Sequence, residues 1–121
     1  MAVRRSNTVD PLLPIYVQEM MEAVKHILGY TNSISLHEFV NNKMLCDAVQ
    51  HQFEILGEAS SHVPHALQKR YKQIPWSMMY SLRNHIAHEY FDVDYEIIWE
   101  IVQHDLPKDL ANLNELYRHL T

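Results

Sequence analysis

Glycine is rare in this chain: only Gly29 and Gly57 occur among 121 residues, and five prolines are the other strong helix breakers. No segment alternates apolar and polar residues convincingly over six or more positions, and the sequence has no glycine-containing hairpin turn. These absences argue against a sheet of short strands. They predict long helices joined by short loops.

Long apolar runs and paired cysteines are also missing. The longest apolar runs are a few residues, far below the roughly 20 that cross a bilayer, and the N-terminus lacks the apolar core of a signal peptide. The single cysteine, Cys46, cannot form an internal disulfide and lies in a helical apolar pattern, where a small buried residue fits. We expect a cytoplasmic protein without membrane contact and assign Cys46 no chemistry.

The composition, with 47% hydrophobic and 21% charged residues, is typical of one globular domain. Residues 1–10 are polar and aperiodic, which predicts a flexible lead-in to a helical domain over residues 11–121. The net charge of −5 repels phosphate, so any contact with a nucleic acid must be local. Nine histidines can change charge near neutral pH, and only position can single out a functional one.

Apolar residues recur at intervals of three and four, which predicts an all-α, up-down bundle of about five helices. A first helix is expected over residues 12–28, with Gly29 as its C-terminal stop. Ser35 and Glu38 have the spacing of a capping box, and the Asn-Asn pair at 41–42 is expected to interrupt the chain before a long helix.

The second half of the chain predicts shorter helices separated by prolines. Pro64 ends the long helix, and Pro75 suits the first turn of a helix over residues 76–88. Asp94 is expected to cap the next helix, and Pro107 to open the last one. The apolar face of the helix after Asp94 is assigned to Ile97, Ile98, Ile101 and Val102.

The most informative stretch is residues 83–90, of the form R-x-x-x-x-H-x-Y, at the end of the helix predicted over 76–88. At about 100° per residue, Asn84 and His88 share a helical face, whereas Arg83 and His88 diverge by roughly 140°. Their convergence on one anion would need the long arginine side chain to swing round, or a helix end that tightens or unwinds.

These side chains suit cleavage of RNA without a metal. Histidine moves protons near neutral pH, arginine pairs permanently with phosphate, and asparagine orients a ring or donates to an oxyanion, while RNA supplies its own 2′-OH nucleophile. Because the motif has one well-placed histidine, acid and base would most simply come from two copies of His88 across a homodimer. The purely structural alternative pairs Arg83 with a surface carboxylate, caps the helix with His88 and packs Tyr90 in the core.

Residues 75–109, which contain this motif, resemble the HepT branch of the HEPN families, and residues 53–59, Phe-Glu-Ile-Leu-Gly-Glu-Ala, resemble the second signature of that branch. The resemblance implies a HEPN-like homodimer and a prokaryotic toxin that cleaves RNA without a metal or cofactor. It also implies a neighbouring nucleotidyltransferase antitoxin of the MntA kind. Carried over residue by residue, it makes Arg83 and His88 the catalytic pair, Asn84 their polar support and Tyr90 the tyrosine that the antitoxin modifies with AMP.

One pair of residues differs from the HepT branch, which often has Arg-Asn where this chain has His51-Gln52. The role that the arginine of the branch has in substrate or partner contact is therefore in question for this chain. Lys69, Arg70 and Lys72 are candidate RNA contacts or, alternatively, a solvated charge run.

Two weaker patterns have structural alternatives. His85, His88 and Glu89 could supply metal ligands, but their spacing is not that of a zincin, and we expect no metal. A polar stripe on the long helix is assigned an interface or structural role: Asp47, His51, Glu54 and Glu58.

Two functional hypotheses remain open from the sequence. The first is a ribonuclease toxin restrained by AMP on Tyr90, with Tyr95 and Tyr80 as the next candidates for modification. The second is a non-catalytic HEPN module that holds a nucleotide or a nucleotidyltransferase. The intact motif favours the first hypothesis, and the acidic net charge favours the second.

Overall fold

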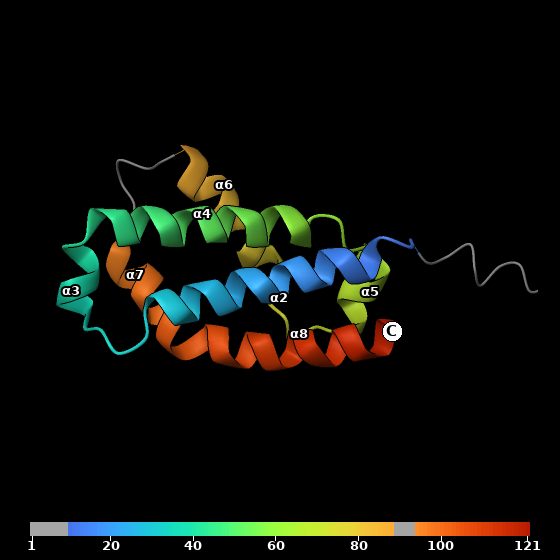
Figure 1. The fold of residues 1–121 in the computed structure, drawn as a ribbon. Helices are drawn as coiled ribbons and strands as arrows, with labels where there is room; N and C mark the ends of the chain where they lie inside the picture. Colours follow the sequence, from blue (N-terminus) through green and yellow to red (C-terminus); the bar gives the residue numbers. More distant parts are fainter. Residues whose placement is uncertain (1–9, 89–93) are drawn as a thin grey trace, which may run out of the picture.

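The computed structural model describes residues 10–88 and 94–121, with side chains described for 10–82 and 94–121. All regular elements in these ranges are helices. The long helices α2 (Leu13–Tyr30), α4 (Lys43–Ser60) and α8 (Leu106–Leu120) run side by side, with α2 between the other two (Figure 1). A fourth helix, α6 (Trp76–His88), packs against α4. The arrangement confirms the predicted all-α bundle.

Shorter helices lie at the two ends of this bundle. Helix α3 (Leu36–Val40) packs against α4 and against α7 (Tyr95–Glu100), and a π-helical segment, η2 (Ile101–Asp105), leads from α7 into α8. Helix α5 (His65–Arg70) lies near the opposite end, where the C-terminus is (Figure 1). Because α5 directly precedes α6 in the chain, it places its cationic residues beside the start of the motif helix.

The core confirms the helical periodicity read from the sequence. Val17, Met20, Val24 and Ile27 of α2 recur at intervals of three and four and are fully buried. Phe39 is also fully buried, and its ring packs 5.3 Å from the Trp99 ring, measured between centroids. The contact holds the end formed by α3 and α7 against the bundle. Fully buried side chains of the other long helices are Phe53, Leu56, Leu113 and Leu116.

Polar side chains start the helices where the sequence predicted. The Ser35 hydroxyl accepts from the Glu38 amide at 3.1 Å, while the Glu38 carboxylate accepts from the Ser35 amide at 2.8 Å, so the capping box is complete. Asn42 caps α4 by accepting from the Leu45 amide at 3.0 Å. Asp94 caps α7 in the same way, accepting from the amide of Glu96 at 3.0 Å.

Two details of the prediction are wrong. Gly29 does not stop the first helix: α2 continues to Tyr30, and the chain turns instead through Ser33, whose φ of 65° is in the left-handed region. Thr31 completes the helix end because its hydroxyl donates to the Ile27 carbonyl at 2.8 Å. Ile97 is 58% exposed and lies outside the apolar face of α7, which Ile98 provides at 3% exposure.

Residues 1–9, most of the predicted lead-in, lie outside the described part of the chain. Of the helices that the structure describes, none combines the length and the apolar character needed to span a membrane.

Candidate functional site

The helix that carries the motif forms over the predicted residues, Trp76–His88. The side chains of Arg83, Asn84 and His88, and all of Tyr90, lie outside the described part of the chain. Helical geometry nevertheless places positions 84 and 88 on the same face as Ser77, which is exposed. Position 83 follows the buried Met79 by four residues and so falls on a different side of the helix.

Two of the three candidate RNA-contacting cations meet at the start of α6. Lys69 and Lys72 line a shallow hollow of about 540 Å³, together with Pro75 and Ser77. Arg70 is exposed at the end of α5 but does not line this hollow. The structure therefore places Lys69 and Lys72, but not Arg70, next to the helix that carries the motif.

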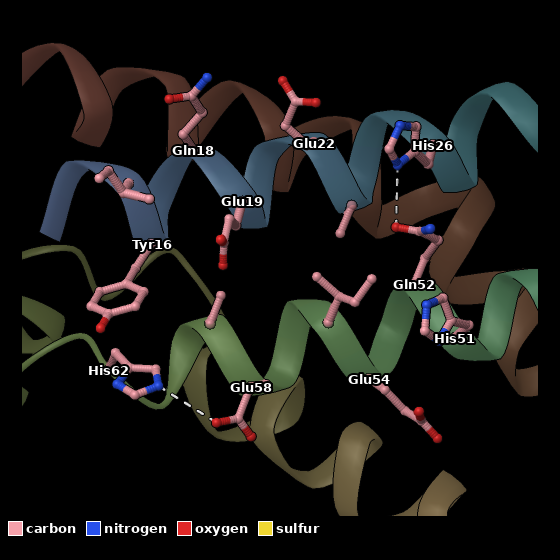
Figure 2. Close-up of a pocket in the computed structure, with 14 residues that line it drawn as sticks. Tyr16, Gln18, Glu19, Glu22, His26, His51, Gln52, Glu54, Glu58 and His62 are labelled. Carbon is pink, nitrogen blue, oxygen red and sulfur yellow. Dashed lines mark hydrogen bonds and ion pairs between the residues drawn. The ribbon is translucent and has the colours of Figure 1, made fainter. Parts of the chain in front are cut away.

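The polar stripe of α4 borders a groove of about 850 Å³ between α2 and α4 (Figure 2). His51, Glu54 and Glu58 line it, whereas Asp47 does not and pairs with Lys43 at 3.2 Å on the open surface. Ile55 and Ala59 give the α4 side apolar surface. We refer to this feature as the α2–α4 groove.

Short-range contacts organise the polar side chains of the α2–α4 groove. His26 Nδ1 lies 3.2 Å from Gln52 Oε1, and His62 Nε2 lies 3.5 Å from a carboxylate oxygen of Glu58. The Tyr16 ring stacks on His62 with 4.3 Å between ring centroids. In Figure 2 the His26–Gln52 contact and the Tyr16–His62 pair lie at opposite ends of the groove and join α2 to the α4 side, whereas the His62–Glu58 contact lies on the α4 side alone.

The charge of the α2–α4 groove is negative. Among the described residues, its lining contains no lysine or arginine and includes four glutamates: Glu19, Glu22, Glu54 and Glu58. Such a surface repels an RNA phosphate and attracts a basic partner. His51-Gln52 belongs to this acidic groove: His51 is exposed on its lining and Gln52 is buried against His26.

The buried Cys46 thiol and the partly buried Tyr95 hydroxyl have structural roles. The Cys46 thiol donates to the Phe39 carbonyl at 3.2 Å, and burial, followed by the nearby Asp47 charge, raises its pKa and so disfavours the thiolate. Gln50 Nε2 donates to the Tyr95 hydroxyl at 2.5 Å, and burial raises the pKa of Tyr95. Cys46 is buried as predicted.

Sequence reasoning missed Asp109, a carboxyl in the core layer of α8. Asp109 is 4% exposed, and burial, reinforced by Asp105, raises its pKa to about 6, while Lys108 opposes the shift. Its Oδ2 has no hydrogen-bond partner among the described residues. The helical spacing could have predicted this burial, because Asp109 follows the buried Leu106 by three residues and precedes the buried Leu113 by four.

Across the side chains described for residues 10–82 and 94–121, no group of three or more His, Cys, Asp or Glu residues is placed to hold a metal ion. The alternative metal set, His85, His88 and Glu89, lies outside those side chains.

Comparison with known proteins defines the class. The family described as Ribonuclease HepT-like matches residues 20–116, which include α6 and its motif. "Putative RNase MJ1380" of Methanocaldococcus jannaschii is 37% identical over 93 residues, covering 77% of this chain and 85% of that protein. "Putative RNase MJ0127" of the same organism is 33% identical over 105 residues, covering 87% of each chain.

A relative from a second archaeon has the family name itself. "Probable ribonuclease HepT" of Thermococcus cleftensis is 34% identical over 92 residues, covering 76% of this chain and 84% of that protein. No solved structure matches the chain significantly. The chain belongs to the ribonuclease HepT-like family, which confirms the predicted HepT resemblance and the predicted enzyme class, a ribonuclease.

Proposed function

We propose that this protein is a metal-independent ribonuclease toxin whose catalytic pair is Arg83 and His88, supported by Asn84. The observation that carries the proposal is the R-x-x-x-x-H-x-Y pattern at the end of α6, inside the matched family region. His88 takes the proton from the ribose 2′-OH, and the 2′-oxygen attacks phosphorus. The 5′-oxygen leaves with a proton from a second acid, so the product carries a 2′,3′-cyclic phosphate. Arg83 neutralises the charge on the phosphoryl oxygens.

The second acid is the reason for proposing a homodimer. The motif has one well-placed histidine, so one chain does not by itself present a complete acid–base pair to a phosphate. Two copies related by a twofold axis bring two copies of His88 to one cleft. Assembly beyond the dimer is left open.

The test of the catalytic pair is RNA cleavage in excess EDTA. Arg83→Ala and His88→Ala should each lower the rate by about 10²- to 10⁴-fold with unchanged helix content. Arg118→Ala and His104→Ala are the matched controls, because both residues are exposed and lie outside α6. Loss of activity in EDTA with recovery in zinc would replace this mechanism with the metal set of His85, His88 and Glu89.

We also propose that a nucleotidyltransferase antitoxin of the MntA kind silences the enzyme by transferring AMP from ATP to Tyr90. The phenol oxygen would attack the α-phosphorus of ATP and release pyrophosphate. The new phosphodiester would draw Arg83 away from the scissile phosphate and occupy the substrate path. Incubation with the antitoxin, ATP and magnesium should add AMP to the wild-type chain and not to Tyr90→Phe. Should Tyr90→Phe still be modified, the next targets to test are Tyr80, which is 48% exposed, and Tyr95.

A binding role is favoured by the α2–α4 groove, whose acidic lining suits a basic protein partner better than RNA. A module that only binds would keep partner affinity and show no RNA cleavage. The double substitution Glu22→Lys and Glu54→Lys should weaken antitoxin binding while leaving RNA cleavage intact, with the exposed Glu115→Lys as control. Both roles place the protein in the cytoplasm with its RNA.

A further inference from the structure

One long stretch of this acidic chain contains no acidic residue. Between Glu58 and Glu89 there is no Asp or Glu, although the chain has 15 of them, and this stretch has four of its 10 Lys and Arg residues: Lys69, Arg70, Lys72 and Arg83. Residues 59–88 thus have a net charge of +4 in a chain of net charge −5. They form α5, the α5–α6 connection and α6. Phosphate is attracted to this part of the molecule and repelled by the α2–α4 groove.

The same stretch lines a hollow of about 550 Å³, which meets the α2–α4 groove at His62. Its volume lies within the range of small-molecule sites, roughly 300–1,000 Å³. The end of α4 contributes Ser60, α5 contributes His65 and Gln68, and α6 contributes Ser77 and Tyr80. We call this feature the Tyr80 hollow.

Aromatic and amide groups in the Tyr80 hollow match the chemistry of a nucleobase. Tyr80 is 48% exposed, and the exposed His65 of α5 lines the same hollow, so the hollow has two aromatic side chains that a ligand can reach. Gln68 Nε2 donates to the Val63 carbonyl at 2.9 Å, which fixes the amide in the wall of the hollow. Tyrosine and histidine are among the side chains on which unpaired RNA bases stack.

The two lysines Lys69 and Lys72 lie next to this hollow and can neutralise the phosphate charge of a bound RNA strand. The hollow lined by Lys69 and Lys72 shares His65, Gln68 and Ser77 with the Tyr80 hollow, so the two form one continuous surface. A base in the Tyr80 hollow would therefore leave its phosphate within reach of either ammonium group.

Helix α6 connects this surface to the motif. Position 84 follows Tyr80 by four residues and position 88 by eight, which is about 6 Å and 12 Å along the helix axis. Position 84 is rotated by about 40° from Tyr80 around the helix, and position 88 by about 80°. These lengths are those of a short piece of RNA strand, so a nucleotide in the hollow would be connected to a scissile bond at His88.

We infer that the Tyr80 hollow is a nucleobase subsite, in which Tyr80 and His65 stack on an unpaired base of the RNA substrate adjacent to the cleavage site. The inference rests on the proposed ribonuclease function and adds to it a recognition site outside the motif. It makes single-stranded RNA, whose bases are free to stack, the substrate class.

The experiment measures binding of a fluorescent single-stranded RNA of roughly 10 nucleotides, within the usual site-size range, to the full-length protein made inactive by His88→Ala. Tyr80→Ala in this background should weaken binding by about tenfold, as expected for a lost base stack, and Tyr80→Phe should restore it because the ring is kept. Tyr30→Ala removes another exposed tyrosine, at the end of α2, and should leave binding unchanged. Far-UV circular dichroism checks that each variant is folded.

Equal binding by the Tyr80→Ala, His65→Ala and Tyr30→Ala proteins would overturn the subsite. Cleavage assays separate this failure from failure of the proposed function. If Arg83→Ala and His88→Ala abolish cleavage while Tyr80→Ala leaves KM unchanged, the catalytic proposal stands and the subsite is wrong. A raised KM in Tyr80→Ala, with kcat retained and rescue by Tyr80→Phe, supports the subsite.

Discussion

Asp109 should make the stability of this protein depend on pH between about 4 and 6. Folding moves the pKa of its carboxyl from the model-compound value of 3.8 to about 6, mainly by desolvation and secondly through Asp105. Because the folded pKa is raised, the folded chain holds this proton over a range where the unfolded chain has released it. The contribution of Asp109 to stability is therefore highest at low pH, and it falls as pH rises through the folded value.

The magnitude follows from the size of the shift. A shift of about two pKa units, at 1.36 kcal/mol per unit, means that ionisation of Asp109 lowers the free energy of unfolding by up to about 3 kcal/mol at pH 7.5. Asp109→Asn keeps the shape of the side chain and removes the ionisation, so it should unfold at higher urea concentration than the wild type at pH 7.5. The corresponding rise in Tm is about 10 °C for a chain of this size.

The assay is urea unfolding followed by far-UV circular dichroism at pH 4 and at pH 7.5. Glu115→Gln is the matched control because Glu115 is an exposed carboxylate on the same helix, and it should change stability by less than about 0.5 kcal/mol. The stability that Asp109→Asn gains over the wild type should shrink towards zero at pH 4, where the carboxyl of the folded wild type is also neutral. An Asn variant that is no more stable than the wild type at pH 7.5 would refute the reasoning.

Three further predictions concern assembly, RNA binding and the core. Light scattering at micromolar concentration should give at least a dimer, and a fully active monomer would contradict the composite site. Lys69→Ala with Lys72→Ala should weaken RNA binding and reduce the slope of log K against log salt by about 2, whereas exposed Lys25→Ala should not. Phe53→Ala should lower the free energy of unfolding by about 3–5 kcal/mol, measured by urea unfolding, because Phe53 is fully buried; a loss below about 1 kcal/mol would contradict its place in the core.

Most of the fold was predictable because local rules determine it. The capping box at Ser35 and the Asp94 cap each depend on residues within a few positions, so sequence spacing was sufficient to predict them. The helix end predicted at Gly29 was wrong because a glycine can also lie inside a helix. The chain turns at Ser33 instead, and no local sequence pattern predicted the left-handed conformation of that residue.

The candidate site was only partly predictable. A motif such as Arg83 to His88 is contiguous and can be read directly, and the HepT resemblance assigned its roles. The Tyr80 hollow draws residues from α4, α5 and α6, and the α2–α4 groove joins residues more than 30 positions apart, such as Glu19 and Glu54. Such hollows depend on how helices pack, so helical periodicity alone does not reveal them. The acid-free stretch over residues 59–88 was visible in the sequence and points to the same surface.

The separation of charge explains how an acidic protein can act on RNA. The glutamates of the α2–α4 groove and the two lysines Lys69 and Lys72 line different hollows, so the net charge of −5 does not describe either surface. At ionic strengths near 0.15 M, charges more than about 8 Å apart are largely screened, and a strand approaching α5 and α6 responds mainly to the lysines nearby. The α2–α4 groove, which meets the Tyr80 hollow at His62, would instead attract a basic protein partner. Under the proposed function, the substrate and a partner would therefore be drawn to differently charged parts of the same small domain.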